Sequence, residues 1–275
     1  MFITDFKEIM DILDTSQSVF LYDTAAISVH ELAFFRHGYQ LPNEFISNHP
    51  IIISQTIVDE LRLHEDADLR YSHFFNQFSK VILINEASFV QYFHEMYSPK
   101  QRSLAKYQNC TIRSFLTIQS LAEAIKNIPN QQIENKVMDL FTTHFYGGRN
   151  KGEYSLLWLS NLIRDVFPTL DINFIGLDRD LYRIVDHCYY RFDSIASEIR
   201  SRVKVRIFSN DSMLQARIRR GLSIAEIVDS YRDPARKVLY REINNGITEH
   251  TIIEGAMDNS LFIELLELRR IEVVY

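Results

Sequence analysis

Four acidic residues lie at the expected ends of strands or near the expected starts of helices, where catalytic side chains are often found. They are Asp23, Glu60, Glu153 and Asp178. Asp23 and Asp178 each follow an apolar run, VFLY and INFIGL, whereas Glu153 opens a helical pattern. Carboxylates that converge repel one another unless they are protonated or bound to a cation. A hard divalent ion such as Mg²⁺ or Mn²⁺ prefers oxygen ligands, and it could activate a water and hold the phosphate of a phosphodiester. The four acids therefore indicate a metal site with hydrolytic chemistry.

The elements expected to position these acids are buried strands. Continuous apolar runs occur at residues 19–22, 51–53 and 81–84, and residues 172–177 (INFIGL) and 203–208 (VKVRIF) are also strand-like. Such runs are typical of strands that are covered on both faces of a parallel sheet. Helical patterns separate them, so the sequence predicts a three-layer α/β/α sandwich with a mostly parallel sheet of about five strands. In such sheets the functional crevice lies beyond the carboxyl ends of the strands, where Asp23 and Asp178 are expected.

The chain is expected to consist of a core in two parts, a helical insertion and a helical extension. Their bounds are 1–98 (first part of the core), 99–146 (insertion), 147–223 (second part of the core) and 224–275 (extension). Only the final IEVVY departs from the helical patterns of the extension. Glu60 is expected in the first turns of a helix whose cap is Ser54 or Thr56.

The acids occur in motifs that resemble those of the PIN-domain family of metal-dependent nucleases. VFLYDTAA, with Asp23, resembles the family's apolar strand that runs into Asp and a small polar residue. SQTIVDEL, with Glu60, resembles its S-x-x-x-V-x-E-L segment, and VILINEASF resembles the strand that follows. KGEYSLLWL, with Glu153, is similar to a Gly-Glu pair that opens a helix, and GLDRDL, with Asp178, is similar to a D-R-D-L pattern. VRIFSNDSMLQARIRRGLS is similar to the final strand and helix of one bacterial PIN-like branch.

The resemblance covers residues 20–97 and 147–223, and it implies a nuclease that hydrolyses RNA. It also implies that the four acids are catalytic and hold Mg²⁺ or Mn²⁺, the number of ions being left open. Asp178 matches the fourth ligand position best, Asp180 is a further metal ligand or alternative, and Asp211 is a weaker rival. The chain departs from the family's small toxin members, since the insertion and the extension make it longer.

Thr24, directly after Asp23, has two expected roles. Its hydroxyl could orient Asp23 or a metal-bound water, as outer groups around metal sites do. It could instead cap the helix that follows. The sequence leaves both open.

The charge distribution bears on a nucleic-acid partner. The formal net charge is −6 and the pI about 5.9, which disfavours such a partner. Residues 202–241, however, contain ten basic residues against four acids, and such a local excess could track phosphates. Arg217, Arg219 and Arg220 lie on a helix expected after the last core strand, so we predict that they bind RNA near the metal site. A solvated helix surface is the alternative.

Several classes of protein are disfavoured by the composition. Cys110 and Cys188 have no CxxC partner, which argues against a disulfide framework and favours the cytoplasm. No stretch approaches the roughly 20 apolar residues of a membrane span, and the first residues do not resemble a signal peptide. The histidines lack the spacing of zinc ligands.

Two other functions fit the same residues. A structure-specific DNA nuclease would use the same type of site, and the sequence does not distinguish it from a ribonuclease. A catalytically idle PIN-like module that binds nucleic acid or protein would be expected to have lost site acids, yet all four are present. A protein partner and a homo-oligomer both stay open.

Overall fold

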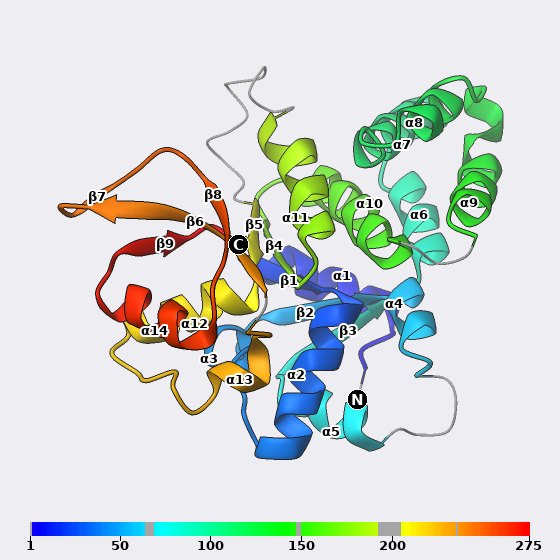
Figure 1. Cartoon of the computed structure of the whole chain (residues 1–275). Helices are drawn as coiled ribbons and strands as arrows, with labels where there is room; N and C mark the ends of the chain where they lie inside the picture. The colour runs from blue at the N-terminus through cyan, green and yellow to red at the C-terminus, as the bar shows by residue number, and fades with distance from the viewer. Residues whose placement is uncertain (1, 64–68, 147–149, 192–204, 235) are drawn as a thin grey trace.

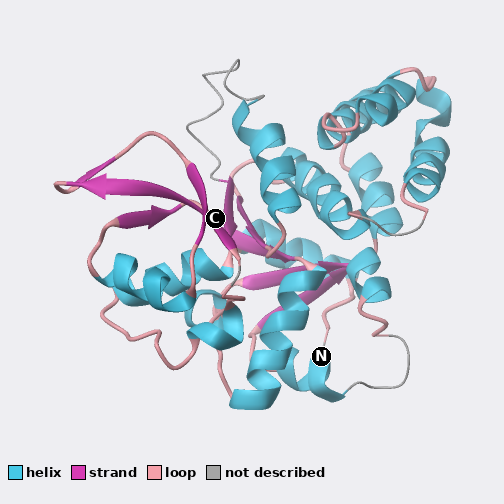
Figure 2. Cartoon of the chain, in the orientation of Figure 1, coloured by secondary structure: helices cyan, strands magenta, loops and turns pink. Residues whose placement is uncertain are grey.

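Five parallel strands form the centre of the protein, as its computed structural model shows (Figures 1 and 2). The structure describes residues 2–63, 69–146, 150–191, 205–234 and 236–275. The strands lie in the order β3-β2-β1-β4-β5. Their bounds are Lys80–Ile84 (β3), Pro50–Ser54 (β2), Ser18–Tyr22 (β1), Asp171–Ile175 (β4) and Val205–Phe208 (β5). Helices flank the sheet, so the expected three-layer α/β/α fold is confirmed.

The central strands form because their side chains are apolar and covered on both faces, whereas the edge strand β5 includes the exposed Arg206. Every residue of β2 is buried, and β1 is buried from its second residue onward. The strand predicted at 172–177 ends earlier than expected, since β4 stops at Ile175 and a short loop precedes Asp178. Residues 203 and 204 of the fifth predicted strand lie outside the described residues, as do Arg202 and Lys204 of the basic segment.

Two groups of helices cover opposite faces of the sheet (Figure 1). On one face, α10 packs across β1 and β2 and contacts α6, α7 and α11. On the other face, α2 contacts both α5 and α13. The bounds of these helices are Thr24–His37 (α2), Leu69–Phe75 (α5), Glu86–Glu95 (α6), Lys100–Ser114 (α7), Lys151–Val166 (α10), Arg179–Val185 (α11) and Val228–Tyr231 (α13). The others nearest the sheet are Phe6–Thr15 (α1), Asn43–Ile46 (α3), Gln55–Glu60 (α4), Asp186–Arg191 (η2) and Asn210–Arg219 (α12).

The order of the strands creates a switch point between β1 and β4. From β1 the chain moves to β2 and β3 at one edge, returns to β4, and then adds β5 at the other edge. Connections leave β1 and β4 in opposite directions, and crevices at such points are the usual binding sites of open α/β sheets. The backbone N–H of Asp23 donates to the carbonyl of Ile175 at 2.9 Å, so the ends of the two strands are held together there.

Most of the predicted insertion is helical and packs on α10. It comprises α7, Gln119–Lys126 (α8), Asn130–Gln132 (η1) and Ile133–His144 (α9). Trp158 of α10 is 1% exposed and lies against the rings of Tyr107, Phe115 and Phe141. Its Nε1 donates to Thr111 Oγ1 at 3.0 Å. Residues 147–149, at the end of this segment, lie outside the described residues.

The prediction of a helical C-terminal extension is wrong for most of that segment. It forms an antiparallel sheet in which β6 pairs with β7, β8 and β9, together with one longer helix, α14 (Figure 2). The bounds are Lys237–Asn244 (β6), Ile247–Thr248 (β7), Ile253–Ala256 (β8), Asn259–Glu267 (α14) and Ile271–Val273 (β9). The overlooked signal is Asn245–Gly246, whose φ values of 54° and 79° form a tight hairpin turn.

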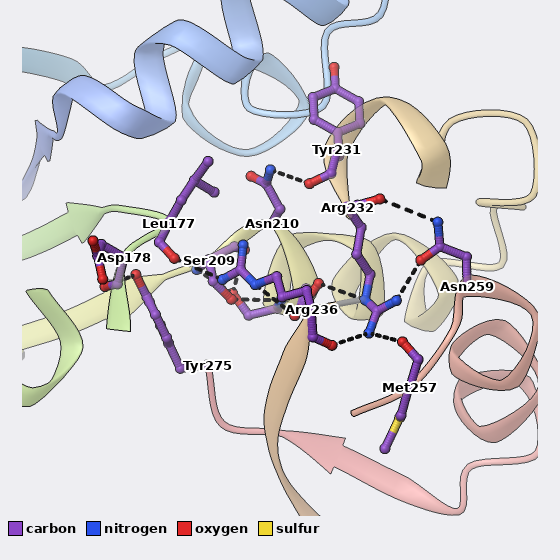
Figure 3. Close-up of polar contacts among 12 residues, drawn as sticks. Leu177, Asp178, Ser209, Asn210, Tyr231, Arg232, Arg236, Met257, Asn259 and Tyr275 are labelled. Atoms are coloured by element: carbon purple, nitrogen blue, oxygen red, sulfur yellow. Dashed lines mark hydrogen bonds and ion pairs between the residues drawn. The ribbon is translucent and has the colours of Figure 1, made fainter. Parts of the chain in front are cut away.

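A buried ion-pair cluster joins this extension to the core. Asp211, at the start of α12, lies 3.3 Å from Arg232 Nε and 3.6 Å from Arg236 Nε. The side chains of Asp211 and Arg232 are completely buried. Arg232 also donates to Asn259 Oδ1 and to the carbonyl of Met257 (Figure 3). One acid of α12 therefore holds two arginines of the extension.

None of the helices in the described ranges combines the length and apolar character that crossing a membrane requires.

Asp211→Asn should lower the free energy of unfolding by about 3–5 kcal/mol, because it leaves Arg232 buried without its counter-charge. Arg219→Gln removes an ion pair with Glu272 in which the arginine is 57% exposed, and it should cost less than about 1 kcal/mol. Urea unfolding of both variants measures the difference. Equally small losses would show that the buried cluster does not stabilise the fold.

Candidate active site

Asp23 lies at the switch point, between the end of β1 and the start of α2. It is 2% exposed. Among the described residues, its Oδ2 atom has no hydrogen-bond partner. Burial, together with the neighbouring charges of Glu153 and Glu60, raises the pKa of Asp23 to about 8. This carboxyl group is thus buried among like charges with one oxygen free to bind something else.

Glu60 is held in a fixed position by two donors. It is the last residue of α4, whose N-cap is Ser54. Thr24 Oγ1 donates to Glu60 Oε2, and the N–H of Gly152 donates to Glu60 Oε1 at 3.0 Å. A Cβ atom at residue 152 would meet Glu60 Oε2 at 2.6 Å and Ile57 Cδ1 at 2.8 Å, so a larger residue there would shift the Glu60 carboxylate.

The hydroxyl of Thr24 donates to Glu60, and not to Asp23 or to the backbone of α2. The reason is the short α4, which ends at Glu60 and brings this carboxylate within reach of the first residue of α2. Thr24 therefore links the first two acids of the site. Its expected role in orienting a metal-bound water stays a prediction.

Glu153 and the acids of α11 complete the acidic group. Glu153 lies in the first turn of α10 and is half-buried. Burial is the main cause that raises the pKa of Glu153 to about 6, and the charge of Glu60 adds to it. The charges of Asp178 and Asp180 also raise the pKa of Glu153. Asp178 also caps α11, since its Oδ1 accepts from the N–H of Asp180 at 3.0 Å.

Asp211 does not belong to this group. Its carboxylate is enclosed by Arg232 and Arg236, so it is neutralised by the protein itself. The structure therefore favours Asp178 and Asp180 over Asp211 as the fourth acid.

A cation bound by these acids would keep several of its water ligands, because few of the described carboxylates are placed to contact it directly. Their donors are all carboxylate oxygens, and the unpartnered Asp23 Oδ2 offers a direct contact. Within the described part of the chain, no group of three or more acidic, histidine or cysteine side chains is arranged to hold a metal ion. Mg²⁺ commonly keeps several waters and binds through one or two carboxylates plus a phosphate of the substrate. A site with one buried carboxylate and others around it suits that mode.

The arginines predicted to bind RNA do not lie beside the acids. Arg217 pairs with Glu44, and Arg220 donates to the carbonyl of Glu44 and covers the ring of Phe45. These partners belong to α3, which precedes β2, so both arginines lie towards the amino ends of the strands. They were expected close to the carboxyl ends of the strands, because their helix follows the last core strand. The helix α12 is ten residues long, and its last turn lies away from that edge of the sheet. Arg219 pairs with Glu272. Their role in binding RNA stays a prediction.

The sequence alone did not single out the basic residues next to Asp178. A hollow of about 560 Å³ beside this acid is lined by Ala25, Leu177, Asp178, Arg179, Asp233, Arg236 and Lys237. Arg179 and Lys237 both pair with Glu254 of β8. Arg236 and Lys237 had counted only as members of the basic segment, because their approach to the site depends on how the extension folds. The position of Arg179, next to Asp178, was the one signal available.

No family model matches this chain, and neither a curated protein nor a solved structure matches it.

The raised pKa of Asp23 predicts a pH dependence of stability in the metal-free protein. Between the unfolded value of 3.8 and the folded value of about 8, the folded state holds a proton that the unfolded state has lost. The free energy of unfolding should therefore fall as pH rises through this window, by up to about 1.4 kcal/mol per pH unit. Asp23→Asn should remove this part of the slope and be no less stable than wild type at pH 8.

Urea unfolding in EDTA at pH 5, 6, 7 and 8 measures both slopes. Asp139→Asn, at an exposed acid of α9, is the control and should keep the wild-type slope. Equal slopes for wild type and Asp23→Asn would mean that the buried carboxyl does not hold this proton.

Proposed function

We propose that this chain is a metal-dependent endoribonuclease of the PIN type that uses Mg²⁺ or Mn²⁺ and acts in the cytoplasm. The observation that supports it most is the buried Asp23 carboxyl at the switch point, with one unpartnered oxygen and with Glu60 and Glu153 as charged neighbours. A protein gains little from burying repelling carboxylates unless a cation binds there. The order of the four acid motifs and their resemblance to the PIN family supply the choice of RNA as substrate.

In this proposal the acids have different tasks. Asp23 would contact the cation directly, while Glu60 and Asp178 would hold it directly or through waters. When bound, the cation would lower the pKa of a water and neutralise charge on the phosphate. Glu153, half-buried in the first turn of α10, would take a proton from the attacking water. Asp180 would orient Asp178, whose carboxylate accepts from the backbone N–H of Asp180, and its charge would add to the negative potential at Glu153.

The residues around the acids would keep them in place during the reaction. Thr24 and the N–H of Gly152 donate to the two oxygens of Glu60 and would orient this side chain in the absence of a cation. The basic residues Arg179 and Lys237 line the hollow beside Asp178. They would face a phosphate that approaches the site. Their pairing with Glu254 would have to loosen for direct contact.

Cleavage of labelled single-stranded RNA and DNA of equal sequence, each with Mn²⁺, tests the proposed activity. RNA should be cut, EDTA should abolish cutting, and Asp23→Asn and Glu153→Gln should each reduce the rate by roughly a hundredfold or more, since a catalytic cation contributes several kcal/mol. Asp139→Asn should cut like wild type. Cutting of DNA alone would identify a DNA nuclease, and binding without cutting by purified, folded protein would identify an idle module.

Mn²⁺ should also raise the melting temperature of the wild type but hardly that of Asp23→Asn. A ligand at a hundredfold excess over its Kd stabilises the native state by about 2.7 kcal/mol. Differential scanning fluorimetry with increasing Mn²⁺, with Asp139→Asn as the control, measures the shift. An equal rise in wild type and Asp23→Asn would place the bound ion elsewhere.

A further inference from the structure

The loop that carries Asp178 is held by the C-terminal extension (Figure 3). This loop, residues 176–178, connects β4 to α11. Arg236 donates from Nη2 to the carbonyl of Leu177 at 2.9 Å, and Tyr275 donates its hydroxyl proton to the carbonyl of Asp178 at 2.9 Å. Two consecutive carbonyls of the loop thus accept from side chains of the extension.

Tyr275 is fixed where it makes this contact. It lies beyond β9, is 1% exposed, and stacks on Tyr182 of α11 with ring centroids 5.1 Å apart. A side chain at Gly176 would come within 3.3 Å of the Tyr275 hydroxyl and 2.4 Å of Leu181 Cδ2. A larger residue at position 176 would thus displace Leu181 and tighten the contact with Tyr275.

Arg236 is fixed in the same way by the ion-pair cluster. Its Nε lies 3.6 Å from Asp211 Oδ2, and the side chain is 17% exposed. Because Asp211 belongs to α12 of the core, it holds the guanidinium at a set position from which Nη2 reaches Leu177. The chain of contacts runs from the core through Asp211 and Arg236 to the loop.

The loop has few backbone contacts of its own beyond β4. Gly176 N–H donates to the carbonyl of Phe208 at 3.1 Å, and Tyr182 N–H approaches the carbonyl of Asp178 at 3.5 Å. The Tyr275 hydroxyl is therefore the closer donor to that carbonyl. Asp178 itself is exposed, so its packing does little to set its position.

We propose that Tyr275 and Arg236 are positioning residues that fix the 176–178 loop, and through it the carboxylate of Asp178, for the site described above. The importance of Asp178 to a cation rests on the proposed function, whereas the hold on the loop does not. The extension then contributes to the site by holding this loop, and its folding determines how well Asp178 is placed for a cation.

Tyr275→Phe removes the hydroxyl and keeps the ring on Tyr182. Hydrogen exchange followed by mass spectrometry should show faster exchange of the backbone amides in residues 177–180 by about three- to tenfold, as expected for the loss of one hydrogen bond. The Mn²⁺ concentration for half-maximal cleavage should rise by a similar factor, while the rate at saturating Mn²⁺ should stay close to that of wild type. Arg236→Lys, which keeps the charge opposite Asp211, should shift both measurements in the same direction.

Tyr39→Phe is a matched control, because the Tyr39 hydroxyl also donates to a backbone carbonyl, that of Glu226 at 3.1 Å. It should change neither measurement. Unchanged exchange at 177–180 in both Tyr275→Phe and Arg236→Lys would overturn the proposal, and so would faster exchange with an unchanged Mn²⁺ requirement. If the wild type neither binds Mn²⁺ nor cleaves, the proposed function fails, and with it the role for a cation, while the exchange measurement still decides whether the extension holds the loop.

Discussion

The repulsion among carboxylates at the switch point is the constraint on which the rest of this structure depends. Asp23 is buried at the paired ends of β1 and β4, from which the connections leave in opposite directions. Its pKa of about 8 reflects both the loss of solvent and the charges of Glu153 and Glu60. A buried acid of this kind lowers stability near neutral pH unless it is protonated or paired with a cation. The protein supplies no arginine or lysine partner to it among the described contacts. By contrast, Asp211 receives two arginines. Asp211 thus has its counter-charges within the protein, whereas Asp23 holds a proton near neutral pH in the metal-free protein.

Three parts of the chain meet to hold the acids around Asp23. The short α4 presents Glu60 to Thr24, and the N–H of Gly152, the second residue of α10, donates to the same carboxylate. The extension holds the loop of Asp178 through Arg236 and Tyr275. The insertion contributes indirectly. Its aromatic rings cover Trp158 on α10 and thereby stabilise the helix that carries Glu153. None of these contacts is between neighbours in sequence.

This distribution explains how far the sequence could predict the structure. Local patterns predicted β1, β2 and β3 well, because strands buried on both faces appear as unbroken apolar runs. The end of β4 was placed too late, since Gly176 and Leu177 continue an apolar run although they form a loop. The extension was predicted as helical, although the Asn245–Gly246 pair indicates a hairpin. The contacts of Thr24, Arg217 and Tyr275 depend on partners 36, 173 and 97 residues away, which local patterns do not identify.

The central claim is that a divalent cation occupies the space next to Asp23 Oδ2. A crystal soaked in Mn²⁺ at pH 8, with data collected at the manganese absorption edge, tests it most directly. The account predicts an anomalous peak within about 2.3 Å of Asp23 Oδ2, a bonding distance for a hard divalent ion, with carboxylate oxygens of Glu60, Glu153 or Asp178 around it directly or through waters. A well-ordered site with no peak beside Asp23, or a peak confined to surface acids elsewhere, would contradict it.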